Sequence, residues 1–82
     1  MKIMTNVKVR LSSIQDVRNF VDTVTKYNID IDLSSGRYIV DAKSIMGIFS
    51  LDLLNPINLT AHTDDASEEK ALLDDLKAFI VA

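Results

Sequence analysis

Few side chains of this sequence are suited to acid–base or phosphate chemistry. The chain contains one histidine, His62, and no cysteine, so it lacks the residue types that most often serve as general bases, thiolate nucleophiles and metal ligands. Ser13 and Ser44 each stand just before an apolar run. A serine in this position caps a helix, and a phosphate on it would meet unpaired N–H groups and the positive end of the helix dipole. Ser13 has no neighbouring base to make it a nucleophile, so we expect it to be a cap; both interpretations stay open for Ser44.

His62 and the acidic residues do not form a recognisable site. His62 falls in the polar phase of the alternating segment 57–62, where a solvated position on a sheet is a simpler interpretation than a phosphate carrier. The C-terminal third contains three acidic pairs, Asp64–Asp65, Glu68–Glu69 and Asp74–Asp75. Adjacent helical residues point in different directions, and the spacing of an EF-hand is missing. We therefore expect a solvated acidic surface with no metal and no cofactor.

The composition is that of a single globular domain covering residues 1–82. The chain is 48% hydrophobic and 26% charged, and it is too short for two ordinary cores. Its net charge of −3 offers no footprint for a phosphate backbone, so direct nucleic-acid binding is not expected. No apolar stretch approaches the roughly 20 residues that span a bilayer, and the first residues lack a signal-peptide pattern. A cytoplasmic protein without membrane contact is expected.

Hydrophobic periodicity predicts an α+β fold. Alternating residues indicate strands over 3–11, 29–33, 38–40 and 57–62, with Gly36 at a positive φ in the turn of a hairpin. Three-and-four spacing indicates a first helix from Ile14 to about Lys26 and a last helix whose apolar stripe runs from Leu72 to Ile80. Ser44 as a cap favours a short helix in the run 45–51. The stripe of the first helix is expected to consist of Ile14, Val17, Phe20, Val21 and Val24. The order βαββαβα predicts a four-stranded antiparallel sheet with three helices on one face and a wet opposite face.

The segment Asp41-Ala42-Lys43-Ser44-Ile45-Met46-Gly47-Ile48-Phe49-Ser50-Leu51 resembles the histidine-containing phosphocarrier (HPr) family of the phosphoenolpyruvate-dependent sugar phosphotransferase system. Lys26-Tyr27-Asn28-Ile29-Asp30-Ile31 is similar to the family's segment at the end of the first helix. The resemblance covers nearly the whole chain and implies an open-faced β-sandwich, in agreement with the pattern of elements.

The family's first helix begins with a His-Ala-Arg-Pro motif, whose histidine accepts and passes on phosphate. Counting back without gaps from Lys26 places Ser13 at the histidine position, Gln15 at the arginine and Asp16 at the proline. A serine phosphate is a poor phosphoryl donor, Gln15 supplies no cation, and Asp16 adds a negative charge where phosphate would sit. We therefore expect that the chain has no phosphocarrier histidine, and a role of His62 in its place is not expected.

Ser44 matches the family's regulatory site, which an ATP-dependent HPr kinase phosphorylates. The following run has more apolar residues than one side of a short helix can bury, so some should be exposed. Ile48 and Leu51 are expected in the core. The resemblance implies a partner-binding surface there and at the start of the first helix, formed by Ile45, Met46, Gly47, Phe49, Ser13 and Gln15.

The sequence thus predicts a non-enzymatic, regulatory protein-binding module, similar to catabolite-repression HPr, that is switched by phosphorylation at Ser44. Its partners by resemblance are HPr kinase, a transcriptional regulator or components of the phosphotransferase system. A phosphocarrier with a non-standard acceptor is the alternative, and an HPr-like fold with an unrelated binding role and no phosphorylation is a third possibility.

Overall fold

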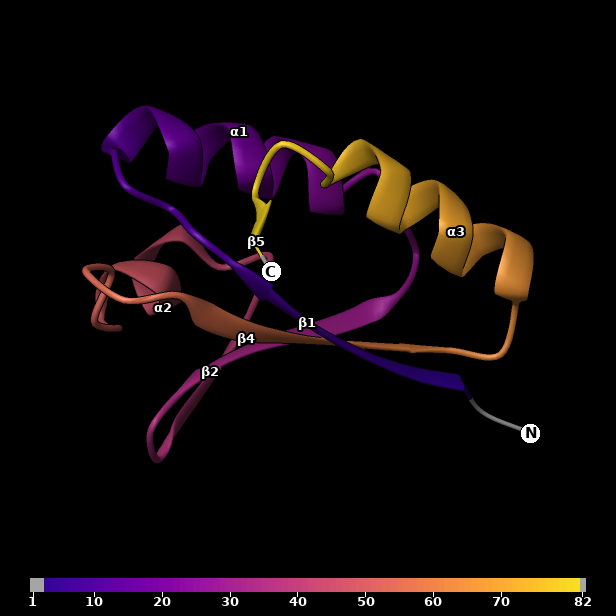
Figure 1. Cartoon of the computed structure of the whole chain (residues 1–82), viewed down its shortest axis with the longest axis horizontal. Helices are drawn as coiled ribbons and strands as arrows, with labels where there is room; N and C mark the ends of the chain where they lie inside the picture. Colours follow the sequence, from indigo (N-terminus) through magenta and orange to yellow (C-terminus); the bar gives the residue numbers. More distant parts are fainter. Residues whose placement is uncertain (1–2, 82) are drawn as a thin grey trace.

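The chain forms an open antiparallel sheet with three helices on one side, as Figure 1 shows. A computed structural model describes residues 3–81. The strands are β1 (Ile3–Val9), β2 (Asp30–Ser35), β3 (Tyr38–Asp41), β4 (Ile57–Thr63) and β5 (Ile80–Val81), and the helices are α1 (Ile14–Val24), α2 (Ile45–Phe49) and α3 (Ala66–Asp75). The spatial order is β3-β2-β4-β1-β5, with antiparallel pairing throughout. The predicted α+β, open-faced β-sandwich is confirmed.

The sheet has five strands, so the prediction of four was wrong by one short strand. The apolar stripe from Leu72 to Ile80 led us to expect a single helix, but α3 ends at Asp75. The chain then turns back, and Ile80 pairs with Val9 at the edge of β1. The backbone N–H of Arg10 donates to the carbonyl of Phe79 at 2.8 Å, so this return satisfies part of an edge that would otherwise be open.

The core lies between the sheet and the helices. Alternate residues of β2 and β4 point inward and are buried, among them Leu33 and Leu59, which pair in register. The helices supply the other side, and the ring of Phe20 in α1 packs edge-on against Phe79 with centroids 5.7 Å apart. Ile14 was wrongly expected in this core: it is 68% exposed, because the apolar stripe begins one turn before α1 reaches the sheet.

A tight hairpin joins β2 to β3. Ser35 pairs with Tyr38 across the two intervening residues, and the first of these, Gly36, has a φ of 60°, as predicted. A glycine with positive φ at the first position of a two-residue loop is the pattern of a type II′ hairpin turn, whose twist matches that of the strands. In Figure 1 this hairpin extends away from the helices. Its outer strand, β3, pairs only with β2 and forms an edge of the sheet.

Candidate functional site

The start of α1 already holds a carboxylate. Ser13 is the N-cap, and its Oγ accepts a hydrogen bond from the backbone N–H of Asp16 at 3.0 Å. The carboxylate of Asp16 in turn accepts from the backbone N–H of Ser12 at 3.1 Å and from its hydroxyl at 2.9 Å. Ser13 therefore caps α1 as expected, and Asp16 completes a capping box whose return bond comes from the N–H of Ser12, one residue before the cap. The positive end of α1 is compensated by a negative side chain of the protein itself.

Ser13 and Gln15 are both exposed at this helix end. The side-chain amide of Gln15 donates to the side-chain oxygen of Asn19 one turn later, at 2.9 Å. Gln15 thus lies along the outer surface of α1. Its amide carries no charge that would neutralise a phosphate.

Ser44 caps α2. Its Oγ accepts from the backbone N–H of Gly47 at 3.1 Å, and its own N–H donates to the carbonyl of Asp41 at 3.0 Å. A Cβ built on Gly47 would lie 3.1 Å from both Ser44 Oγ and Val40 Cβ. Such distances are closer than ordinary packing, so the glycine lets the capped turn sit directly against β3. Ser44 and Gly47 are both half-buried.

Lys43 connects the start of α2 to the end of α1. Its ammonium group donates to the carbonyl of Tyr27 at 2.8 Å, and Tyr27 follows the last turn of α1, where its own N–H donates to the carbonyl of Val24. The hydroxyl of Tyr27 reaches α3, where its single proton is shared between the carbonyl of Ala71 and the carboxylate of Asp75. Tyr27 is therefore bonded to α1, to α3 and to Lys43, which precedes α2.

The same contacts perturb the titration of Tyr27. The hydrogen bond to Asp75, partial burial and the negative charges of Asp75, Asp74 and Glu68 raise the pKa of Tyr27 from 10.0 to about 12. Each of these causes disfavours the phenolate. The hydroxyl consequently remains a hydrogen-bond donor throughout the neutral pH range.

An apolar surface adjoins Ser44. On α2, Met46 is 80% exposed, Phe49 41% and Ile45 39%, so these three predicted contact residues are all accessible. Ile48 and Leu51 are buried, as the division of this run between core and surface predicted. We call Ile45, Met46 and Phe49 the α2 apolar surface.

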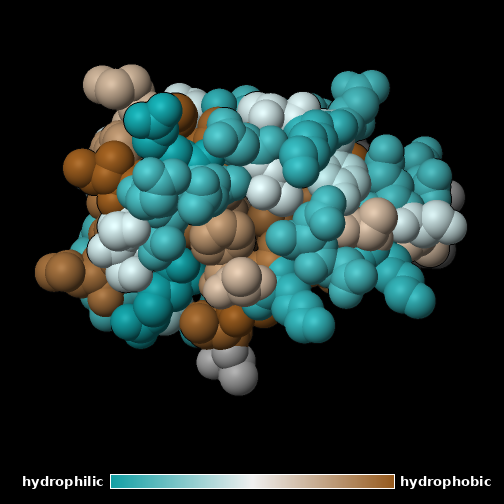
Figure 2. All heavy atoms as spheres, turned by 90° about the horizontal axis from the view of Figure 1, so that it is seen from above, coloured by the Kyte–Doolittle hydropathy of each residue, from teal (hydrophilic) through white to brown (hydrophobic). Residues whose placement is uncertain are grey.

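Two further exposed apolar residues escaped the sequence interpretation. Ile14 opens α1, and Leu54, which is 87% exposed, lies in the loop that follows α2. Figure 1 places α2 beside the first half of α1, and these two helices are in contact. Figure 2 shows hydrophobic side chains gathered at this end of the molecule. The sequence feature that indicates exposure of Leu54 is its position just before the turn residues Asn55-Pro56, because turns and loops lie on the surface.

His62 lies elsewhere. Its Nε2 is 3.0 Å from the Asp32 carboxylate, and these residues project from β4 and β2 with the polar phase of the sheet. The neighbouring hydroxyl of Thr60 donates to the side-chain oxygen of Asn6 at 2.7 Å. These residues occupy the face opposite the helices, so His62 does not meet the N-termini of α1 or α2.

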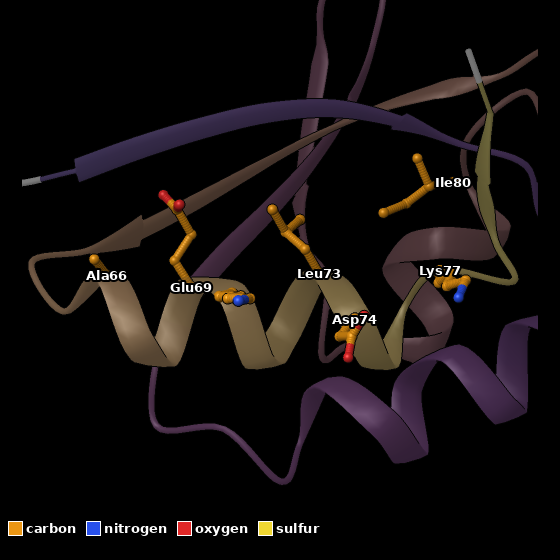
Figure 3. Close-up of a pocket in the computed structure, with 7 residues that line it drawn as sticks. Ala66, Glu69, Leu73, Asp74, Lys77 and Ile80 are labelled. Atoms are coloured by element: carbon orange, nitrogen blue, oxygen red, sulfur yellow. The ribbon is translucent and has the colours of Figure 1, made fainter.

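An open groove of about 580 Å³ runs along α3. Figure 3 shows Glu69 and Leu73 on its wall facing β1, with Ile80 at one end. Two acidic and two basic residues line it together with Leu73, Ile80 and Ala66, so their formal charges cancel. None of the predicted site residues lies in this groove.

Within residues 3–81, the structure contains no group of three or more histidine, cysteine or acidic side chains that could hold a metal ion. Across the same range, no helix is long and apolar enough to cross a membrane.

Comparisons with known proteins identify the family. A family model described as "PTS HPr component phosphorylation site" matches residues 15–82, a range that begins after Ser13. A crystal structure of HPr-C-His from Thermoanaerobacter tengcongensis is similar at 30% identity and a TM-score of 0.66, covering 95% of this chain and 92% of that one. A phosphocarrier protein HPr from Bacillus anthracis str. Ames is similar at 27% identity and a TM-score of 0.69, covering 95% and 96%. The comparison with curated proteins gave no match.

HPr proteins are phosphocarriers that work with protein partners of the phosphotransferase system and are not catalytic enzymes. The open sheet, the capped α2 segment and the match over most of the length agree with one another. The chain belongs to the HPr family of the sugar phosphotransferase system.

Proposed function

We propose that this chain is a regulatory protein-binding member of the HPr family that does not relay phosphate, and that phosphorylation of Ser44 controls its binding. The observation that carries the proposal is the exposed α2 apolar surface directly beside the capping hydroxyl of Ser44. An exposed apolar patch next to a modifiable hydroxyl can be altered by adding one charged group. We also propose that residues 1–82 act as one domain in the cytoplasm.

The start of α1 supports the non-carrier part of the proposal. A phosphoryl relay needs a nitrogen nucleophile and a nearby cation, but the cap is Ser13, and Asp16 supplies a carboxylate where positive charge would help. A second anion placed against Asp16 would be repelled at short range. The helix dipole, which is the general attraction for anions at such a site, already acts on Asp16.

The α2 apolar surface supports the docking part. Met46 projects almost fully into solvent, and its flexible thioether adapts to differently shaped partners. In this proposal the partner also contacts the backbone at Gly47. Ser13 and Gln15 extend the binding surface to the start of α1. Phosphorylation of Ser44 would place about two negative charges at the margin of this surface. These charges would weaken binding to an apolar or acidic partner and strengthen binding to a partner that presents arginines.

Phosphorylation by an HPr kinase tests the switch. We expect incubation with the kinase and ATP to produce an acid-stable phosphate on Ser44, found by mass spectrometry of the peptide. The matched control is Ser50→Ala, which removes a hydroxyl at the other end of α2 and should leave labelling intact. Equal labelling of Ser44→Ala and the unchanged chain would eliminate Ser44 as the site.

Substitution of Met46 tests the docking surface. Met46→Glu should weaken capture of kinase or regulator by about tenfold or more, because a charge is then buried on binding. Met46→Leu keeps the apolar volume and should bind nearly as well. A cooperative thermal transition for both variants shows that the fold is retained. Unchanged binding by the Met46→Glu variant would exclude this surface.

The carrier alternative has its own outcome. After incubation with phosphoenolpyruvate and the first enzyme of the system, a carrier would hold acid-labile phosphate that a sugar permease component could remove. We expect no such label. If label appears and His62→Gln abolishes it, the chain is a carrier with an unusual acceptor.

A further inference from the structure

We propose that β3 is a self-association edge, through which two copies of this chain pair antiparallel and join their sheets. The main evidence is the charge pattern of the segment 37–41. When two copies of it pair antiparallel in one register, each Arg37 lies opposite Asp41 of the second copy. This interface uses none of the residues of the α2 apolar surface and does not depend on the function proposed above.

The edge of β3 is open for pairing. Ala42 donates its N–H to the carbonyl of Ile31 at 2.9 Å, which fixes the alternation of the β2–β3 ladder. The pair of Leu33 and Val40 is hydrogen-bonded in that alternation, whereas the N–H and C=O groups of Ile39 point away from β2. The middle of the edge, 38–40, contains neither the charge nor the proline that commonly protects an edge strand.

Two large apolar side chains lie exposed on this strand. Ile39 is 70% exposed and Tyr38 is 71% exposed. Ile39 follows the polar face of the sheet, since it pairs with Ser34, while Tyr38 lies on the other face. Both residues lie on the hairpin, which Figure 1 shows extending away from the helices.

Charge complementarity identifies a second copy as the occupant. Arg37 and Asp41 lie two residues on either side of Ile39, both exposed. With a two-fold axis at Ile39, each Arg37 meets Asp41 of the second copy, and the two Ile39 residues face each other. Tyr38 then faces the second copy's Val40, an aromatic and β-branched pairing that is favourable across strands. Shifting the register by one or two residues separates Arg37 from Asp41.

The charges of the single chain favour the same arrangement. Asp41 lies directly opposite Asp32 in the β2–β3 pair, and like charges in this position repel. Within residues 3–81, neither Arg37 nor Asp41 has an ionic partner, and the Asp41 carboxylate accepts one hydrogen bond, from the backbone N–H of Lys43. A second copy would supply Arg37 to the side of the sheet where carboxylates gather.

Sedimentation velocity of the full chain tests the proposal. The contact is short compared with stable interfaces, so we expect weak, concentration-dependent dimerisation between micromolar and millimolar protein. Ile39→Pro removes the outward N–H and should weaken association by about tenfold or more. Arg37→Glu should weaken it as well, whereas Arg18→Glu, the same change on the exposed surface of α1, should not.

A mixing experiment tests the register. Arg37→Glu places a carboxylate against Asp41 of the second copy, and Asp41→Lys places an ammonium group against the second copy's Arg37, so each variant alone should stay monomeric. An equimolar mixture of the two variants brings opposite charges together at both ends of the paired strands, and we expect a heterodimer. Thermal transitions of each variant verify folding. Concentration-independent sedimentation of the unchanged chain overturns the proposal, and so does a mixture that remains monomeric.

Discussion

Replacing Asp16 with asparagine tests whether a built-in carboxylate stabilises the start of α1. The native carboxylate accepts two hydrogen bonds from Ser12, at 3.1 and 2.9 Å. Asparagine keeps the shape and one acceptor oxygen but loses the charge. The hydrogen bonds from Ser12 become weaker when the acceptor is neutral. The interaction of the carboxylate with the helix dipole, about 0.3–1 kcal/mol, is also lost. We therefore expect the variant to be less stable by about 0.5–1 kcal/mol. Urea unfolding followed by circular dichroism measures this difference.

Asp22 provides the matched control on the same helix. It is exposed and lies in the last turn of α1, which ends at Val24. A negative charge near a helix C-terminus is unfavourable, so Asp22→Asn should stabilise the chain by about 0.3 kcal/mol. The two identical substitutions should therefore have opposite signs, and added salt should reduce both effects. Equal signs for the two variants would refute the dipole argument and leave Asp16 with a purely local role.

Three further perturbations check other parts of the structure. Gly47→Ala should destabilise the chain in urea unfolding, because overpacking against Ser44 costs about 1–3 kcal/mol and exceeds a helix-propensity gain of about 1 kcal/mol; a gain in stability would contradict the close approach. Spectrophotometric titration should show the pKa of Tyr27 at about 12, and Asp75→Asn should lower it. Since the unfolded chain releases this proton near pH 10, folding stability should fall as the pH rises from 10 through the folded pKa, and a flat profile there would contradict the raised pKa. Ile48→Ala should cost about 2–5 kcal/mol in unfolding experiments, and a loss below about 1 kcal/mol would mean that this side chain is not in the core.

The order of the larger elements was predictable because their patterns are local. Alternation in β1, β2 and β4 and the spacing of Val17, Phe20, Val21 and Val24 reflect burial on one face, which sequence periodicity records directly. The fifth strand was missed because Ile80 continues an apolar stripe with helical spacing. Its strand conformation depends on the free edge of β1, which is distant in sequence.

The candidate site was only partly predictable for the same reason. The caps at Ser13 and Ser44 depend on neighbours within four residues, and both formed. The contacts of Tyr27 with Asp75 and of Lys43 with Tyr27 join residues 48 and 16 positions apart, and no local pattern indicated them. The exposure of Ile14 depends on where the sheet lies beneath α1, which its spacing in the sequence does not encode.

The hydrogen bonds of Tyr27 should couple local unfolding of the three helices. Its carbonyl holds Lys43 before α2, its N–H closes the last turn of α1, and its hydroxyl holds α3. Local opening of any one of these segments breaks a bond that restrains another. We therefore expect the amide protons of the three helices to exchange with solvent at similar rates in native-state hydrogen exchange, as one cooperative unit. Removing the Tyr27 hydroxyl should release α3 first and separate its exchange from that of the others.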